Sequence, residues 1–222
     1  LGGPGNNHVS DVKTDAAGDI YLTGEFSGSI TFGGVVHQSS AGIDVFVAKM
    51  SPVGQVIWFR QGGGPGIDRG IKLAVGNGQV AVVGEFMFTA DLMGQSLTSA
   101  GGPDIFLALL DASTGNLVWA TRGGGALSSD RPYGVSIAPG GGVTMAGEFR
   151  GTADIAGSSL TSMLDPNSLD PSVDVFIASY AAGGTPLWVV QGSAKFTDRA
   201  IDVVHDGAGN VYVAGQFSDT IQ

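Results

Sequence analysis

An apolar stretch that ends in Gly-Glu-Phe or Gly-Gln-Phe occurs four times in this chain. Repetition at a nearly fixed interval indicates a fold made of copies of one supersecondary unit. The motif glycines, Gly24, Gly84, Gly147 and Gly215, lie 60, 63 and 68 residues apart. The stretches are rich in Val, Ile, Tyr and Thr, and turn-forming residues separate them from their neighbours, which is typical of β-strands. The copies occupy residues 20–26, 80–86, 143–149 and 211–217.

Each copy is predicted to be the second of four strands in its unit. In the second unit, for example, we expect strands at residues 68–75, 80–86, 104–110 and 117–120. No window shows a helical apolar period longer than a turn or two. The units cover residues 7–64, 65–125, 126–192 and, in part, 193–222. The pattern predicts a single all-β segment over residues 1–222, a β-propeller of four-stranded antiparallel blades with three complete blades and a partial one.

The partial unit is predicted to hold only two strands, so the outer edge of its second strand lacks a partner. Residues 1–7 match the ends of later units, and the chain begins at Leu1 with neither an initiator Met nor a signal peptide. We therefore expect a piece of a larger protein, whose last blade is completed by another chain or by the missing part of the same chain. A free two-stranded ribbon at residues 198–222 would count against this expectation. A Pro- and Asp-rich insertion at residues 164–171 is predicted to be a surface loop.

Composition excludes several classes of function. The formal net charge is −10, which makes the chain a poor candidate for binding nucleic acids or anionic membranes. It has no cysteine, which excludes disulfides, thiolate catalysis and zinc–thiolate sites. No apolar run reaches the ~18 residues of a membrane-spanning helix. The 38 glycines show no Gly-X-Y period and indicate many tight turns.

All three tryptophans occupy one position of the unit, 14 or 15 residues after the aspartate of an Asp-Xaa-Phe motif. We interpret them as packing between blades rather than as a platform for an aromatic ligand. The same interpretation applies to the phenylalanines of the two repeated motifs. These residues are Trp58, Trp119, Trp188, Phe26, Phe86, Phe149, Phe217, Phe46, Phe106 and Phe176.

Together these motifs resemble those of one bacterial repeat family. The combination of Asp-Arg, Asp-Xaa-Xaa-Gly-Asn-Xaa-Tyr-Val-Xaa-Gly, Asp-Xaa-Phe-Xaa-Ala-Lys and Gly-Xaa-Xaa-Xaa-Trp is similar to the β-propeller repeats often called SBBP, over nearly the whole chain. The resemblance implies a secreted, lipoprotein or cell-surface bacterial protein, usually with no established enzymatic activity. The units depart from the pattern at Asn7-His8, which replaces Asp-Arg, at Gln216, which replaces Glu, and at residues 139–142, which lack the Asp/Asn turn.

The chain has only three glutamates, all within Gly-Glu-Phe. Because the first two strands of a unit run antiparallel, the Asp-Arg that starts one lies beside the Gly-Glu-Phe that ends the other. Arg69 is then expected near Glu85, Arg131 near Glu148, Arg199 near Gln216, and His8 near Glu25. We favour a structural ladder of ion pairs at the blade ends; the alternative is a ring of carboxylates that binds a cation or a sugar. The candidate residues are Asp68, Arg69, Glu85, Asp130, Arg131, Glu148, Asp198, Arg199 and Glu25.

Other chemistry has less support. A pair of catalytic carboxylates is disfavoured, because such pairs are normally unique rather than repeated. The turn residues Asp15, Asp19, Asp206 and Asn210 lack the spacing of a calcium loop and are predicted to form Asx turns. Asp44, Asp104 and Asp174 are predicted to cap backbone amides. His8, His37 and His205 lie in unmatched positions, so neither a metal site, nor a catalytic triad, nor a cofactor is predicted.

The favoured function is a non-enzymatic extracellular or cell-surface module that serves as a protein- or glycan-binding scaffold. One alternative is a structural subunit of a larger assembly. A less favoured one is a propeller hydrolase or lyase with acidic residues at the channel mouth. Mutual pairing of the Asp-Arg and Gly-Glu-Phe side chains would support the scaffold, whereas two unpaired acids in one open pocket would support the enzyme.

Overall fold

The computed structural model describes residues 2–126, 130–167 and 170–218, and every regular element in that part of the chain is a β-strand. The strands form several antiparallel sheets, so the predicted all-β class is confirmed. Among these residues there is no helix with the length and apolar character needed to cross a bilayer.

Three sheets and a two-stranded ribbon follow one another along the chain. The first sheet pairs β1 (Asn7–Thr14), β2 (Ile20–Phe32), β3 (Val35–Met50) and β4 (Val56–Gly62) in that order. The second contains β5 (Arg69–Gly76), β6 (Gln79–Phe86), β9 (Asp104–Asp111) and β10 (Leu117–Gly125). The third pairs β11 (Arg131–Ile137), β12 (Val143–Arg150), β15 (Val173–Tyr180) and β16 (Pro186–Gly192). The ribbon pairs β17 (Arg199–His205) with β18 (Val211–Gln216).

In the second and third units, the chain forms a hairpin between the second and third strands of the unit, where the sequence analysis predicts no strand. They are β7 (Thr89–Leu92) with β8 (Gln95–Thr98), and β13 (Thr152–Ile155) with β14 (Ser158–Thr161). β13 also pairs with β10, so the second sheet has six strands rather than the predicted four. The sequence did carry a signal: two alternating four-residue strands flank the pairs Met93-Gly94 and Ala156-Gly157, which adopt the positive φ of a two-residue hairpin turn.

These hairpins reach back to the outer strand of the preceding unit. Gly63 and Asp91 exchange two backbone hydrogen bonds, and β10 pairs with β13 through Gly125 and Ala153. Glycine is required at this crossing, because a Cβ on Gly125 would collide with the backbone oxygen of Thr152. The Gly-Gly-Gly segments are therefore places where two backbones pass in contact.

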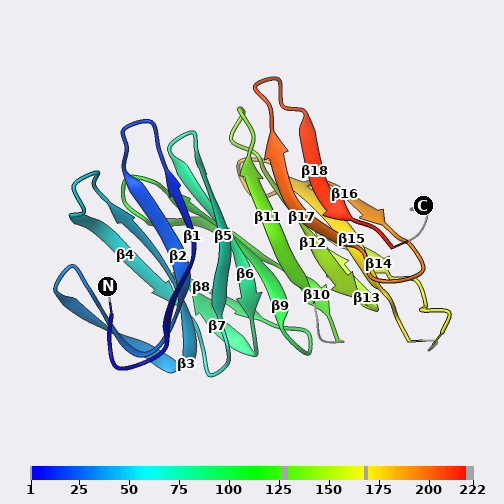
Figure 1. The fold of residues 1–222 in the computed structure, drawn as a ribbon, viewed down its shortest axis with the longest axis horizontal. Helices are drawn as coiled ribbons and strands as arrows, with labels where there is room; N and C mark the ends of the chain where they lie inside the picture. The colour runs from blue at the N-terminus through cyan, green and yellow to red at the C-terminus, as the bar shows by residue number, and fades with distance from the viewer. Residues whose placement is uncertain (1, 127–129, 168–169, 219–222) are drawn as a thin grey trace.

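The sheets stack face to face in an open row, and the first strand of each later unit (β5, β11 and β17) packs on the preceding sheet (Figure 1). The first sheet and the ribbon of β17 and β18 lie at opposite ends of this row. One apolar cluster joins the first and second sheets through Val45, Val82 and Phe106, and another joins the second and third through Leu107 and Phe149. A smaller cluster seats the ribbon on the third sheet; its buried members are Ala146, Val175, Ala200 and Val203.

The third strand of the second unit shows why the sheets must stack. Seven consecutive residues of β9, from Asp104 to Leu110, are buried. Because side chains alternate between the two faces of a strand, Phe106 and Leu110 pack in the cluster shared with the first sheet, and Ile105 and Leu109 pack in that shared with the third. A strand that is apolar on both faces needs a neighbour on each side.

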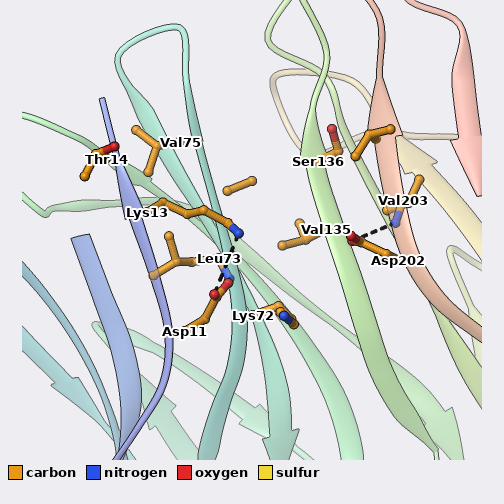
Figure 2. Close-up of a pocket in the computed structure, with 12 residues that line it drawn as sticks. Asp11, Lys13, Thr14, Lys72, Leu73, Val75, Val135, Ser136, Asp202 and Val203 are labelled. Atoms are coloured by element: carbon orange, nitrogen blue, oxygen red, sulfur yellow. Dashed lines mark hydrogen bonds and ion pairs between the residues drawn. The ribbon is translucent and has the colours of Figure 1, made fainter. Parts of the chain in front are cut away.

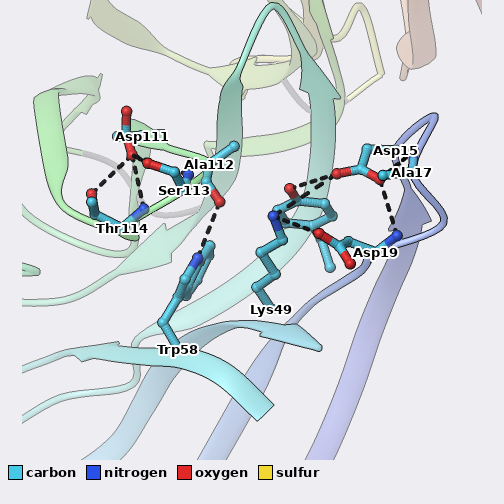
Figure 3. A network of polar contacts seen from close by, with 10 residues as sticks. Asp15, Ala17, Asp19, Lys49, Trp58, Asp111, Ala112, Ser113 and Thr114 are labelled. Carbon is cyan, nitrogen blue, oxygen red and sulfur yellow. Dashed lines mark hydrogen bonds and ion pairs between the residues drawn. The ribbon is translucent and has the colours of Figure 1, made fainter. Parts of the chain in front are cut away.

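Tryptophan joins successive sheets by the same contact twice, and Figure 3 shows the first of these contacts, that of Trp58. The indole N–H of Trp58, on β4, donates to the carbonyl of Ala112 at 3.1 Å, in the turn between β9 and β10. The ring lies over Gly115, where a Cβ would come within 2.8 Å of it. Trp119 repeats the contact on the next unit, with a 2.8 Å bond to Ala182. Trp188 makes no such bond among the described residues and is 40% exposed.

The inserted loop of the third unit is exposed, as predicted, and the partial unit contains the two strands that the sequence predicts. A bridge between Leu164 and Pro171 closes the inserted loop, and Leu164 is 58% exposed; Ser168 and Leu169 lie outside the described residues. The ribbon of β17 and β18 packs on the third sheet mainly through β17, and no described strand pairs with the outer edge of β18. Residues 219–222 of that predicted unit also lie outside the described part.

Replacement of the buried tryptophan should cost much more stability than replacement of the exposed one. We expect Trp58→Ala to lower the free energy of unfolding by about 3–5 kcal/mol, because it removes an inter-sheet ring and leaves a cavity. Trp188→Ala is the matched control and should cost less than about 1 kcal/mol. Urea unfolding followed by circular dichroism measures both, and equal losses would show that the indole contact does not join the sheets.

Candidate functional site

The predicted pairing of the first two strands is confirmed in every unit. The register places Arg69 opposite Glu85, Arg131 opposite Glu148, Arg199 opposite Gln216 and His8 opposite Glu25. The candidate residues of the polar ladder thus gather at one end of each first and second strand.

The ion pairs, however, connect neighbouring sheets rather than strands of one sheet, which corrects our expectation. Arg69 Nε lies 2.7 Å from a carboxylate oxygen of Glu25, one sheet earlier in the chain. Arg131 pairs with Glu85 at 2.7 Å, and Arg199 with Glu148 at 2.6 Å. Strand register fixes only which Cα atoms are adjacent; the long arginine side chain extends to the neighbouring sheet.

The result is a ladder of alternating charge that crosses the described sheets. The side chains of Glu85 and Glu148 are only 12% and 7% exposed, whereas their arginine partners stay partly in solvent. Desolvation by burial raises the pKa of Glu85, and the charges of Arg131 and then Arg69 oppose that rise. Tyr133 also donates its hydroxyl to Glu148 at 2.9 Å. Each glutamate therefore has a cationic partner, which is the arrangement expected of a scaffold.

The aspartates of the Asp-Arg motif are buried clamps. Oδ2 of Asp68 accepts the N–H of Gly64 at 2.7 Å, and Oδ1 accepts the N–H of Met87 at 3.2 Å. The carboxylate thus fastens the end of the preceding unit to the residue after Gly-Glu-Phe. Desolvation by burial raises the pKa values of Asp68 and Asp130 to about 6. The corresponding partners are Gly125 and Arg150 for Asp130, and Ala194 and Ser218 for Asp198.

The remaining candidate acids serve local structure, as predicted. Asp44, Asp104 and Asp174 accept the backbone N–H groups of Ser40, Ala100 and Met163. Oδ1 of Asp15 accepts the N–H groups of Ala17 and Asp19, both at 3.0 Å, which is an Asx turn. Oδ1 of Asp206 does the same for Ala208 and Asn210 at 2.9 Å.

One of these turns has a second role that the sequence did not reveal (Figure 3). Lys49, on β3, lies 2.8 Å from Asp19 and 3.9 Å from Asp15, with its ammonium 5.0 Å from the ring centre of Tyr21. Tyr21 donates its hydroxyl to Oδ2 of Asp15 at 3.0 Å. Burial opposes the charge of Lys49, yet its contacts with Asp19 and Tyr21 raise its pKa. We call this cluster of Asp15, Asp19, Tyr21 and Lys49 the lysine corner.

A small cavity lies where the first strands of the four units meet, and Figure 2 draws its lining residues. It encloses about 240 Å³ between β1, β5, β11 and β17. Its charged lining consists of Asp11, Lys13, Lys72 and Asp202, two acids and two bases. Asp11 already accepts the N–H of Leu73 at 3.1 Å, and Asp202 that of Val203 at 2.9 Å. Its acids are therefore balanced by lysines and bonded to the backbone, and none of the three glutamates lines it.

A bulge at the same place in each first strand shapes this cavity. The register shifts once in each of the four strands, just before Asp11 in β1 and just before Lys72 in β5. A bulge inserts one residue and redirects the side chains beside it. Sequence reasoning missed this feature, because an extra residue does not disturb the spacing of the motifs. The corresponding positions in the other first strands are Gly134 and Asp202.

His205 and His37 lie in different surroundings, and neither is hydrogen-bonded to a carboxylate among the described residues. His205 lies between two hydroxyls, 2.9 Å from Oγ of Ser136 and 3.2 Å from Oγ1 of Thr144. Burial lowers its pKa, and no carboxylate is hydrogen-bonded to its ring. His37 stacks on Phe59 at a centroid distance of 4.0 Å. Within the described part of the chain, no three His, Asp or Glu side chains gather in a way that could hold a metal ion.

The far end of the row presents the largest contrast between equivalent residues. Tyr21 is fully buried in the first unit, whereas its counterpart Tyr212 is 57% exposed. Phe149 is fully buried, whereas Phe217 is 48% exposed. Among the described strands, β18 pairs only with β17. We call this surface of β16, β17 and β18 the open end; its exposed apolar residues are Leu187, Trp188, Val190, Ile201, Val204, Tyr212, Val213 and Phe217.

No family model matches this chain, and a search of curated proteins finds no match either. The resemblance to bacterial β-propeller repeats consequently stays a hypothesis that rests on the repeated motifs. The function has to be inferred from the geometry of the described residues.

The ladder can be tested with two double-mutant cycles. Glu85→Gln and Arg131→Gln should show a coupling energy of about 1 kcal/mol, a value limited by the solvent exposure of the arginine. The control cycle combines Arg131→Gln with Glu148→Gln, the partner in strand register, and should give less than half of that coupling. Urea unfolding at neutral pH measures all the single and double variants. A larger coupling in the control cycle would place the ion pair within one sheet.

The buried clamps should give the protein a defined pH dependence. Because folding raises the pKa of Asp68 and Asp130 from 3.8 to about 6, the folded state binds more protons than the unfolded state between these values. Their contribution to stability is therefore greatest below about pH 4 and declines as the pH rises to 6. Asp68→Asn should remove part of this decline, on the order of 2 kcal/mol between pH 4.5 and 7.5.

The control for this experiment is Asp111→Asn. Hydrogen bonds from Ser113 and Thr114 lower the pKa of Asp111 to about 2, so its titration lies below the tested range. Its replacement should leave the difference in unfolding free energy between pH 4.5 and 7.5 unchanged. If Asp68→Asn behaves in the same way, the clamp does not titrate as inferred.

Proposed function

We propose that the chain is a segment of a β-propeller that acts as a non-enzymatic extracellular or cell-surface scaffold of a bacterium. Its stacked sheets are then blades, and the ribbon of β17 and β18 is the inner half of a further blade. We propose that this half-blade binds the strands that complete it, from another chain or from a further part of the same chain.

The observation that carries this proposal is the open end. An unpaired strand edge offers backbone N–H and C=O groups to an added strand. In the complete sheets the equivalents of Tyr212 and Phe217 are covered, and the tryptophan equivalent to Trp188 lies over a turn of the next unit. The open end therefore presents one side of an inter-sheet contact: its centre is apolar, and its edge can pair with an antiparallel pair of strands.

The pairing of the ladder supports a scaffold over an enzyme. Its three glutamates are matched with arginines, and the acids with the most strongly raised pKa values, Asp68 and Asp130, are buried and bonded to backbone amides. A structural subunit of a larger assembly is a second candidate, and the same open end favours it. Glycan binding would instead use the polar cavity between the first strands, with Lys72 as its cation.

Binding of a hairpin tests the proposal. The probe is residues 43–62 of this chain, which contain the paired parts of β3 and β4, displayed on a soluble carrier protein. The immobilised 222-residue chain should bind it saturably, and Trp188→Ala should weaken binding at least tenfold, because the hairpin turn loses its indole contact. Glu25→Gln, at the other end of the row, is the matched control and should leave the affinity unchanged.

Two results would contradict the proposal. One is the absence of saturable hairpin binding by a chain that circular dichroism shows to be folded. The other is glycan binding in a panel of neutral and acidic oligosaccharides that Lys72→Ala abolishes and Trp188→Ala leaves intact, since the ligand would then occupy the cavity.

A further inference from the structure

We propose that the strand that pairs with β18 carries a lysine, and that Asp206 and Tyr212 bind this lysine. The occupant of the open end is accordingly a β-hairpin of this chain's own repeat type with a cationic residue at one defined position. The inference rests on the proposed function and adds the chemistry of the partner.

The argument begins with a turn that occurs twice. Asp206 is to Tyr212 what Asp15 is to Tyr21: the two residues are six apart, and the tyrosine hydroxyl donates to Oδ2 of the aspartate, at 3.2 Å and 3.0 Å. Both aspartates also accept two backbone N–H groups of their turns. The other two units have no such pair, since Ala81 and Thr144 occupy the tyrosine position.

In the first unit this arrangement holds a cation. Lys49 is only 8% exposed, and Asp15, Asp19 and the ring of Tyr21 surround its ammonium. The lysine comes from β3, the strand that pairs with β2, and lies directly opposite Tyr21. At the end of the row the same corner is built, but no strand lies beside β18 among the described residues.

The register of the first sheet predicts where the partner's residues lie. Gly24 is opposite Phe46 and Tyr21 is opposite Lys49. Transferred to β18, this register places a phenylalanine opposite Gly215 and, three residues later, a lysine opposite Tyr212. The partner strand then reads Asp-Xaa-Phe-Xaa-Ala-Lys, with its aspartate opposite Phe217.

The charge of the corner fits one lysine. Asn210 stands where the first unit has Asp19, and its side-chain N–H donates to Oδ2 of Asp206 at 2.7 Å. Hydrogen bonds from Asn210 hold the pKa of Asp206 below its usual value, so the group is a carboxylate at neutral pH. A single ammonium neutralises it, whereas an apolar residue at that position would bury the carboxylate without a counter-ion, which is costly.

Two other sites, the cavity between the first strands and His205, give weaker support for an inference about a ligand. The cavity between the first strands has its acids bonded to the backbone, and His205 is held by hydroxyls of the third sheet. For neither of these sites does the described part of the molecule contain a second copy that holds a ligand. The lysine corner has such a copy: the first unit contains it with the ammonium of Lys49 bound, and the last unit contains the same turn without a described cation.

The test compares hairpins that differ only at the lysine. Residues 43–62 on the carrier protein are measured beside the same hairpin with Lys49→Met, which keeps the length of the side chain but not its charge. The Lys49→Met hairpin should bind the 222-residue chain about tenfold more weakly, and Lys49→Arg should restore most of the affinity. Raising the salt concentration should weaken only the charged hairpins.

The protein side of the contact is tested by Asp206→Asn, which keeps the turn because Oδ1 still accepts both N–H groups. This variant should also lose about tenfold in affinity for the wild-type hairpin, with no further loss for the Lys49→Met hairpin. Asp15→Asn is the matched control: its corner already holds Lys49, so the affinity should not change.

The outcomes separate the two proposals. Two results would overturn the proposed lysine contact but not the proposal that a hairpin completes the sheet. One is equal binding of the wild-type and Lys49→Met hairpins; the other is equal binding of the wild-type hairpin by the wild-type protein and by Asp206→Asn. No binding of either hairpin would overturn both. Self-association of the chain through its open end, seen as a concentration-dependent dimer that Asp206→Asn leaves unchanged, would assign that surface to a second copy and also overturn the inference.

Discussion

The second sheet of this protein is apolar on both faces, and this constraint governs the rest of the structure. A strand such as β9 cannot bury seven consecutive residues within its own sheet, so a second sheet has to lie on each side. Every inter-sheet device found here serves that stacking: the tryptophan over the following turn, the hairpin that reaches back, and the arginine that crosses to the preceding sheet. The fold is a linear series of equivalent interfaces, and its stability resides between units as much as within them.

The polar contacts add register to this apolar stacking. An apolar face alone would allow one sheet to slide over the next. The Arg–Glu pairs and the buried aspartates bond specific atoms of neighbouring units, so each sheet has one position. Burial makes these groups costly to leave unpaired, which is why the same residues recur at the same place in each unit. Repetition of charged residues in this chain therefore has a structural explanation.

A series of equivalent interfaces has two ends, and each end presents half of a contact that is complete inside the row. At the open end, Trp188 and Tyr212 are residues whose counterparts are covered elsewhere in the same molecule. Internal copies of a contact thus serve as a reference for what an end can bind. The two ends also differ in charge from the interior, with His8 in place of an arginine and Gln216 in place of a glutamate. Both replacements fall on ladder positions whose neighbouring sheet is not among the described ones.

The amino-acid sequence alone determined the four main strands of each complete unit, their antiparallel order and the register of Arg69 with Glu85, because these depend on residues close in the chain and on the two-residue period of a strand. It also indicated that aspartates cap turns, which is a local property. It did not predict the hairpins of β7 with β8 and of β13 with β14. Only the tertiary structure decided that Arg69 bonds Glu25, that Lys49 lies in a corner made by Asp15 and Tyr21, and that a bulge opens a cavity between first strands. Those contacts join segments whose separation in space is set by how sheets pack, and no local pattern of residues encodes that distance.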